Sequence, residues 1–168
     1  MGNGIEITGL SASFNLAASN FDSDAATKLS LGTSVERAAA NLPQSTTGNL
    51  FTITGGRILL TGVLGEVTTV IETQANNAKL VFDPTITGSN VDLCANLNIS
   101  ADVVGSLYTI TGTAANAMVD GLGVVAMASP WILQAGAIAL TCSASNTGQV
   151  KWKIWYMPLD AGVTVAAA

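Results

Sequence analysis

Residues 90–100 read Asn-Val-Asp-Leu-Cys-Ala-Asn-Leu-Asn-Ile-Ser, and every second position of this stretch is apolar. Successive side chains of a β-strand point to opposite faces of its sheet. The alternation therefore predicts a strand with one buried face, while the intervening polar residues and Cys94 occupy the other. The predicted buried face consists of Val91, Leu93, Ala95, Leu97 and Ile99.

Residues 149–157 show the same alternation near the end of the chain. One face carries Trp152, Ile154 and Tyr156, and the opposite face carries Lys151, Lys153 and Trp155. An apolar run at 136–143 precedes this strand, and the Ser-Asn-Thr-Gly sequence between the two runs is typical of a turn. The two runs therefore predict a hairpin.

Short β-branched and aliphatic runs, separated by Gly, Asn and Pro, fill most of the remaining chain. The longest, at 57–69, contains Gly62 and Gly65, which indicates a bulge or a bend. About eight short strands with such turns predict an all-β protein, a two-sheet β-sandwich of the jelly-roll type. The other expected strands lie at 51–54, 79–82 and 107–111.

Residues 1–47 differ from the rest, because Ser, Ala, Asn and Asp dominate and apolar runs are short. This composition predicts an N-terminal arm that is weakly structured or ordered on a partner, followed by the sandwich domain at residues 48–168. A weak helical stretch is expected at 34–42, with Ser34 as its N-cap and Pro43 ending it.

The 168-residue chain is 49% apolar and only 10% charged, whereas typical soluble domains are ~25% charged. Small neutral residues replace the missing charge, which suits a protein in extensive contact with other protein. A net charge of −5 with six scattered Lys and Arg residues cannot supply the positive cluster that nucleic acid requires. An anionic membrane surface is disfavoured for the same reason.

Few residues can support catalysis. The chain has no His, which removes the commonest general base and metal ligand, and its eleven Asp and Glu residues are dispersed. Cys94 and Cys142 lie in separate apolar runs and are interpreted as small buried side chains, with a disulfide or a reactive thiol as the alternative. The sequence therefore predicts a non-enzymatic protein with no catalytic residue, no metal and no cofactor.

Two features between residues 121 and 150 suggest other functions but are rejected. Residues 121–126 match the G-x-G-x-x-A pattern of dinucleotide sites, yet Pro130 falls where the required helix would run. The whole stretch lacks charge and is long enough to cross a bilayer. Pro130, Gln134 and several Gly residues interrupt it, so two strands joined through a turn explain it better than a membrane helix.

Three tryptophans occur late in the chain, at Trp131, Trp152 and Trp155. Sugar stacking or anchoring of an interface is the functional interpretation, and core packing is the alternative. Alternation places Trp152 on the buried face of its strand. Trp155 lies on the opposite face with Lys151 and Lys153, and these three residues are our candidates for an interface.

Several stretches from residue 43 onward resemble a known family. They are Leu-Phe-Thr-Ile-Thr-Gly-Gly-Arg-Ile-Leu-Leu at 50–60, Gly-Glu-Val-Thr-Thr at 65–69, Ala-Asn-Asn-Ala-Lys-Leu at 75–80, Asp-Leu-Cys-Ala at 92–95, the run 142–152 and Tyr-Met-Pro-Leu-Asp at 156–160. Together they are similar to small virion proteins encoded near the head genes of tailed bacteriophages. These are features of strands and turns, with no catalytic motif among them.

The resemblance implies a jelly-roll capsid decoration (cement) protein, usually a homotrimer, that binds the outer surface of the phage head where major capsid protein subunits meet. It further implies a location in the virion, after synthesis in the cytoplasm of the bacterial host. A phage tail or fibre component that binds carbohydrate or the host surface is the alternative. A carbohydrate-active enzyme, with two carboxylates that meet in space, is a third hypothesis.

Overall fold

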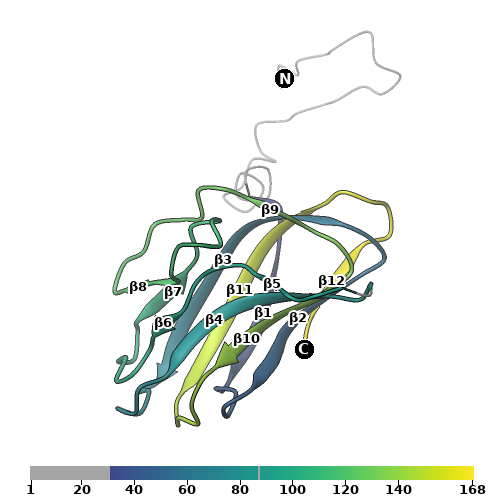
Figure 1. Cartoon of the computed structure of the whole chain (residues 1–168). Coiled ribbons are helices and arrows are strands. Elements are labelled where there is room, and N and C mark those ends of the chain that lie inside the picture. Colours follow the sequence, from purple (N-terminus) through teal and green to yellow (C-terminus); the bar gives the residue numbers. More distant parts are fainter. Residues whose placement is uncertain (1–30, 87) are drawn as a thin grey trace, which may run out of the picture.

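A computed structural model of the chain describes residues 31–86 and 88–168 as two antiparallel six-stranded sheets packed face to face (Figure 1). The all-β sandwich predicted from the sequence is therefore confirmed, with more and shorter strands than expected. The strands are β1 (Thr33–Asn41), β2 (Thr47–Thr54), β3 (Ile58–Thr69), β4 (Asn77–Pro84), β5 (Val91–Asp92), β6 (Leu97–Asn98), β7 (Leu107–Thr109), β8 (Val119–Gly121), β9 (Trp131–Leu133), β10 (Gly136–Cys142), β11 (Gln149–Pro158) and β12 (Thr164–Ala167).

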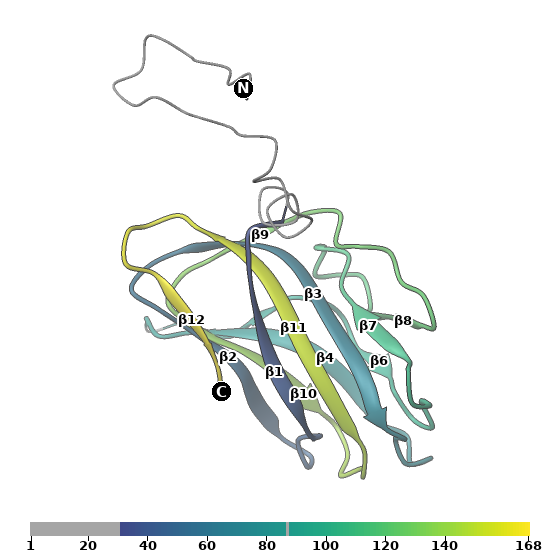
Figure 2. The same cartoon turned by 180° about the vertical axis from the view of Figure 1, so that it is seen from behind.

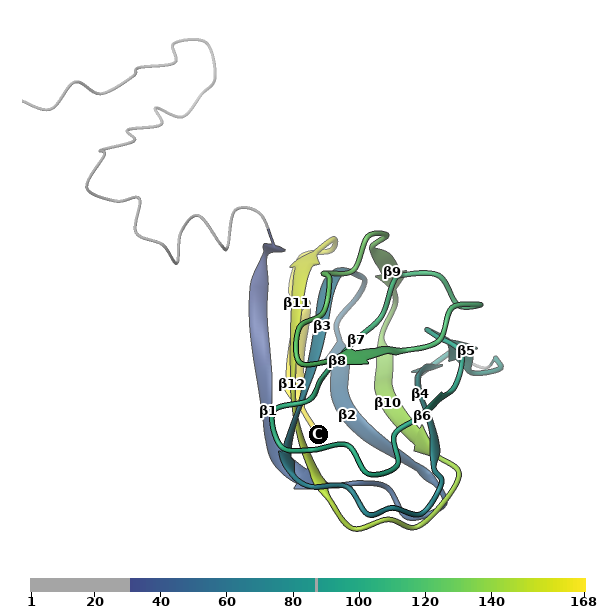
Figure 3. The ribbon, with the colours of Figure 1, turned by 90° about the vertical axis from the view of Figure 1, so that its left-hand side faces the viewer.

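The strands pair in the nested order of a jelly roll. One sheet runs β1-β11-β3-β7-β8, with β9 also paired to β3, and the other runs β12-β2-β10-β4-β5, with β6 also paired to β4. The first strand, β1, pairs with β11, the last strand but one; inside this pair, β2 pairs with β10, β3 with β7, and β4 with β5 and β6. Seen along the layers, the β1-β11-β3 sheet stands apart from the β2-β10-β4 sheet (Figure 3).

The core lies between the two sheets and is almost entirely apolar. Every inward position of β11 is buried, and the indole of Trp152 stacks on the Tyr108 ring at a centroid distance of 6.2 Å. On one open side of the sandwich, Arg37 Nε of β1 donates to the main-chain oxygen of Ala168, 3.0 Å away, beside β12. Figure 2 shows β1 and β12 next to each other at this side. The largest fully buried side chains include Trp152, Tyr108, Phe51, Ile53, Ile58, Leu60 and Ile138.

The predicted hairpin at 136–157 is wrong, although both of its strands exist. β10 pairs with β2 and β4, whereas β11 pairs with β1 and β3, so the two strands belong to opposite sheets. Residues 143–148 cross from one sheet to the other. Alternation shows which face of each strand is buried, but two strands facing each other across a core show the same pattern as two paired strands.

The predicted continuous strand at 90–100 is also wrong, because it is split into β5 and β6. Asp92 and Leu97 pair with Val81 and Ala78 of β4, so five steps along one strand match three along the other. The extra residues leave the ladder, and Ala95 bridges to Ala117 instead. Both Leu93 and Cys94 are then buried, and Cys94 Sγ accepts a hydrogen bond from the Leu80 N–H.

The predicted helix at 34–42 is a strand, β1, and the arm predicted for residues 1–47 extends too far toward the C-terminus. β1 pairs with β11 from Thr33 to Asn41, with one irregularity between Arg37 and Ala40, and Val35 and Leu42 pack on the core. Sheet pairing and burial override a weak helix propensity. Residues 1–30 lie outside the part of the chain that the structure describes.

The predicted irregularity in the 57–69 run is confirmed as a bulge. Trp155 of β11 pairs with Gly62 of β3, but the next residue, Tyr156, pairs with Leu60, so Thr61 is extra. Gly65 lies opposite Trp152 in the same ladder. A Cβ at Gly65 would come within 2.8 Å of the Trp152 ring, so only glycine lets this indole lie flat against β3.

Two buried asparagines hold together the loops that cross between the sheets at one end of the sandwich. The Asn76 Oδ1 accepts from the Ser143 and Ala144 N–H groups at 3.0 and 3.3 Å, and its Nδ2 donates to the Ala144 carbonyl. Asn146 Nδ2 donates to the carbonyls of Glu72 and Gln74 at 3.2 and 2.6 Å. Because both amides are fully buried, each loop depends on the other for its main-chain hydrogen bonds.

Replacing Gly65 with Ala tests the packing of Trp152 on β3. We expect the free energy of unfolding to fall by about 1–3 kcal/mol, because the new methyl group forces the indole out of its position. Gly123→Ala is the matched control, since a Cβ there meets nothing within 4 Å. Equal stability of the two variants in urea unfolding would contradict this account.

Replacing Asn76 with Ala tests the connection between the crossover loops. The free energy of unfolding should fall by about 2–4 kcal/mol, because two buried N–H groups lose their acceptor. The exposed neighbour provides a control of identical chemistry, and Asn77→Ala should change stability by less than about 0.5 kcal/mol. A loss of the same size in both variants would show that Asn76 has no special role.

Candidate interaction surface

The three interface candidates lie together on the outer face of β11, as the alternation predicted. Lys151, Lys153 and Trp155 are each partly buried, whereas the residues between them are fully buried in the core. Lys151 Nζ forms an ion pair with Glu66 of β3 at 2.8 Å, and this carboxylate raises the pKa of the lysine. Lys153 Nζ lies 5.4 Å from the centre of the Trp155 ring, within range of a cation–π interaction.

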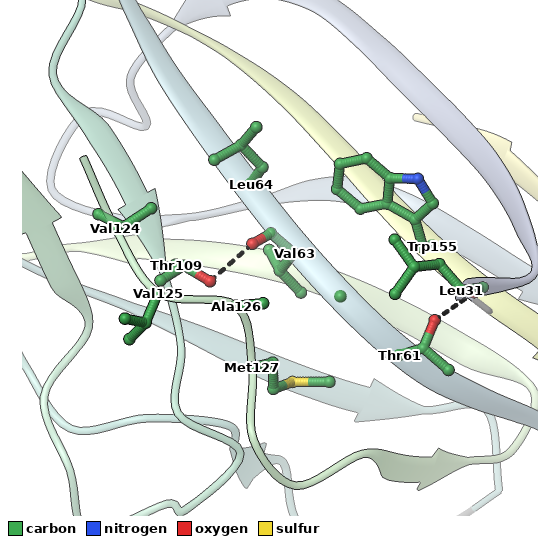
Figure 4. A pocket seen from close by; sticks show the side chains of 11 residues that line it. Leu31, Thr61, Val63, Leu64, Thr109, Val124, Val125, Ala126, Met127 and Trp155 are labelled. Carbon is green, nitrogen blue, oxygen red and sulfur yellow. Dashed lines mark hydrogen bonds between the residues drawn. The ribbon is translucent and has the colours of Figure 1, made fainter. Parts of the chain in front are cut away.

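Trp155 forms one wall of an apolar groove on this face, a cavity of ≈ 200 Å³. Figure 4 shows Trp155, Leu31 and Thr61 on one side of the groove, with the chain segment 124–127 on the other. β3 forms the floor through Gly62, Val63 and Leu64, and Thr109 of β7 contributes the remaining lining residue.

The bulge in β3 makes room for the groove. Gly62 faces the Trp155 ring, and a Cβ at this position would approach the ring to 3.2 Å. Hydrogen bonds fix one side of the groove and its floor. Thr109 Oγ1 donates to the Val63 carbonyl at 2.8 Å, and Thr61 Oγ1 donates to the Leu31 carbonyl. The groove is therefore built into the sheet and does not depend on a chance arrangement of surface side chains.

Apolar side chains continue from the groove along the same sheet. Met157, Leu59 and Ile132 are neighbours in the register of β11, β3 and β9, and they share the outer face. Ile132 is 66% exposed, and Val125, which lines the groove, is 73% exposed. We call this surface, formed by the groove together with Met157, Leu59 and Ile132, the apolar face.

The outer face of the opposite sheet has a different chemistry. Thr47 and Thr141 join their hydroxyls at 2.8 Å across β2 and β10, and Thr54 pairs with Thr164 in the same way at 2.7 Å. Lys79 forms an ion pair with Asp92 at 2.7 Å. Polar groups there bond to one another, whereas the other outer face combines the Lys151–Glu66 ion pair with the apolar face defined above.

A second hollow, of ≈ 410 Å³, lies at the end of the sandwich near β9. Arg57 and Gln134 contribute polar groups to its lining, beside Trp131 and apolar residues that include Phe82. The Trp131 Nε1 is itself covered, and no group of the described residues bonds to it. Asp160 holds Arg57 in place through bonds of 2.9 Å to Nε and 2.7 Å to Nη2, and this pairing lowers the pKa of Asp160 to about 2.

The ionisable groups with shifted pKa values in the core do not form an accessible reaction centre. The Tyr108 hydroxyl donates to Asp102 Oδ2 at 2.5 Å, and burial raises the pKa of both groups. Tyr108 is only 1% exposed, so a substrate cannot reach its hydroxyl. Within residues 31–86 and 88–168, no group of three or more His, Cys, Asp or Glu side chains could hold a metal.

Cys94 and Cys142 are both free and buried, so neither forms the alternative disulfide. Burial raises the pKa of both thiols, that of Cys142 to about 11, which disfavours the reactive thiolate. Their interpretation as small core side chains is confirmed.

Two parts of the groove were missed in the sequence. Leu31 was assigned to the arm. The segment 124–127 was considered only in connection with two rejected features, the dinucleotide pattern and the membrane helix. Gly121 ends β8, and residues 122–127 form no helix and lie in the loop that follows it. The unusual apolarity of Leu122, Val124 and Val125 in a glycine-containing loop was the available signal, since turns are rarely so apolar.

Comparisons with protein-family models, with curated proteins and with solved structures found no match for this chain. The resemblance to phage virion proteins therefore stays a prediction. None of the helices in the described residues is long and apolar enough to cross a membrane.

The Arg57–Asp160 pair predicts how acid affects this end of the sandwich. A carboxyl whose pKa is lowered on folding stabilises the fold above its unfolded value of about 3.9, and this contribution disappears as the pH falls toward about 2. The stability difference between the parent and Asp160→Asn should therefore be constant above about pH 5 and shrink between about pH 4 and 2. Thr54→Val, a change without a titrating group, should show no such shrinkage in urea unfolding at each pH.

Proposed function

We propose that this chain is a non-enzymatic structural protein of a phage virion, a capsid decoration protein that binds the outer surface of the head between major capsid protein subunits. The observation that carries the proposal is the apolar face. An outward sheet face with exposed Ile132 and Val125 at a tryptophan groove is unusual for an independent soluble domain. Large apolar patches of this kind mark surfaces that other proteins cover.

The chemistry of the apolar face suits a permanent protein interface. Trp155 is an aromatic anchor beside a preformed hollow, and Trp is among the residues that most often dominate binding energy. Lys151 is already neutralised by Glu66, so covering this part of the face does not leave an unpaired charge. A low overall charge points the same way, because charged residues are depleted at the centres of interfaces.

A shell that holds packaged DNA gains from additional contacts between its subunits. A decoration protein that assembles as a homotrimer would engage several capsid subunits at once, and linked sites multiply the effective affinity. The resemblance noted from residue 43 onward supports the same function.

A tail or fibre component that binds carbohydrate is the second candidate, and one observation favours it. The hollow at Trp131 combines an aromatic side chain with an arginine held by Asp160 and with the amide of Gln134. Aromatic and planar polar groups of this kind suit the faces and hydroxyls of a sugar.

Binding to preformed phage heads that lack this protein tests the decoration function. Trp155→Ala should weaken binding about 30-fold, the effect of losing an interface anchor worth about 2 kcal/mol. Lys79→Ala, on the polar outer face, is the control and should bind like the parent, and both variants should first be shown to unfold like the parent. Heads that do not bind the parent chain, or virions in which it occurs only in the tail, would overturn the proposal and favour the carbohydrate-binding alternative.

A further inference from the structure

The hollow of ≈ 410 Å³ near β9 is bordered by an unpaired strand edge from each sheet. In the part of the chain that the structure describes, β9 pairs only with β3, and β5 pairs only with β4. Val91 of β5 and residues 131–134, which are β9 and the residue after it, line the hollow together. Figure 3 shows β9 and β5 at the same side of the sandwich. The hollow therefore lies where each sheet ends without a further strand.

The residues of β9 that line the hollow show that its edge faces the hollow. One face of a strand presents only every second residue, yet four consecutive residues, 131–134, are lining residues here. Among the described residues, no main-chain hydrogen bond outside the sheets involves residues 131–133. A strand that is paired on one side leaves the N–H and C=O groups of every second residue pointing away from its partner. The edge of β9 therefore offers unpaired main-chain donors and acceptors to a ligand in the hollow.

Arg57 and Gln134 supply polar side chains at one end of this edge. They extend the β3–β9 ladder by one position beyond its last pair. Asp160 holds the Nε and Nη2 of Arg57 at 2.9 and 2.7 Å, whereas no group of the described residues accepts from Nη1. The guanidinium is therefore fixed in place, and its remaining N–H groups are available to an acceptor on a ligand.

The charges around the hollow favour an uncharged ligand. Asp160 compensates the charge of Arg57, and Asp83, next to the lining residue Phe82, forms no ion pair with a described cation. An acidic ligand therefore gains no net attraction. Apart from the two polar side chains the lining is apolar and includes Phe82 and Leu133, so few groups are present to bond the several hydroxyls of a sugar.

We propose that this hollow binds an extended, uncharged peptide segment of another protein. The segment pairs with the free edge of β9, places a large apolar side chain in the hollow and directs a main-chain carbonyl to Arg57. Strand addition takes its affinity from main-chain hydrogen bonds and its specificity from pockets for alternate side chains. Ile132 lines the hollow and also belongs to the apolar face, so the segment lies at the border of that face. The inference goes beyond the decoration function and does not depend on it.

Filling the hollow tests the site. Displayed random peptides of twelve residues are selected on the full chain, and the tightest one is synthesised with a fluorescent label. Val91→Phe, which adds an aromatic ring at the hollow, should weaken binding of this peptide at least tenfold. Val104→Phe is the matched control and should bind like the parent, because Val104 is as exposed as Val91 but does not line the hollow. Both variants should first be shown to unfold like the parent. Failure to enrich any peptide, or equal affinities of the parent and Val91→Phe, would refute the proposal.

Methylation of the peptide main chain tests the strand pairing. An added strand directs only every second N–H toward β9. N-methyl groups at alternate positions of the selected peptide should therefore weaken binding at least tenfold in one of the two registers and less than threefold in the other. Arg57→Lys, which keeps the charge but removes the planar guanidinium, should weaken binding at least threefold. Equal effects of the two methylation registers would contradict strand addition.

Two other results would assign the hollow to a different occupant and overturn the proposal. Binding of a free monosaccharide that Val91→Phe blocks, without any enriched peptide, would support the carbohydrate alternative. Self-association of the parent that Val91→Phe abolishes would show that a second copy supplies the strand. No phage head is used in these experiments, so failure of the decoration function would leave their results interpretable.

Discussion

Two tryptophan–glycine pairs between β11 and β3 connect the core of this protein to its surface. Trp152 lies opposite Gly65 and Trp155 lies opposite Gly62, and the two pairs face opposite sides of the same sheet. The inner pair fixes the register of β11 by seating a large indole on a residue without a side chain. Because strand register is all-or-none, the outer pair follows, and the groove is where the inner packing requires it to be.

The alternation that defines the sheet faces could be read from the sequence, but strand partners could not. Residues 149–157 have their apolar side chains inside and Lys151, Lys153 and Trp155 outside, as predicted. The same kind of pattern failed at 90–100, because a bulge within the stretch buries Leu93 and Cys94 together. Pairing also depends on residues distant in sequence, which is why β10 and β11 were assigned to one hairpin and β1 to an arm.

The residues of the candidate site were likewise predicted only in part. Its β11 residues were predicted because a single strand determines their direction. Leu31 and the loop 124–127 were not, since they reach the groove only when β1 pairs with β11 and the loop after β8 folds back toward β3. Gly62 was noted as the cause of a bulge, yet its second effect, space for the Trp155 ring, required the register of β11 to be known.

The contrast between the two outer faces carries the functional argument furthest. On the β2-β10-β4 sheet, threonine hydroxyls and the Lys79–Asp92 pair satisfy one another, so water is an adequate neighbour. On the apolar face, Leu59, Met157 and Ile132 follow one another across three strands without a polar residue between them in the register. Burial of such a row under another surface is favourable, because it removes apolar side chains from water. This row is therefore the part of the surface on which the proposed interface depends most.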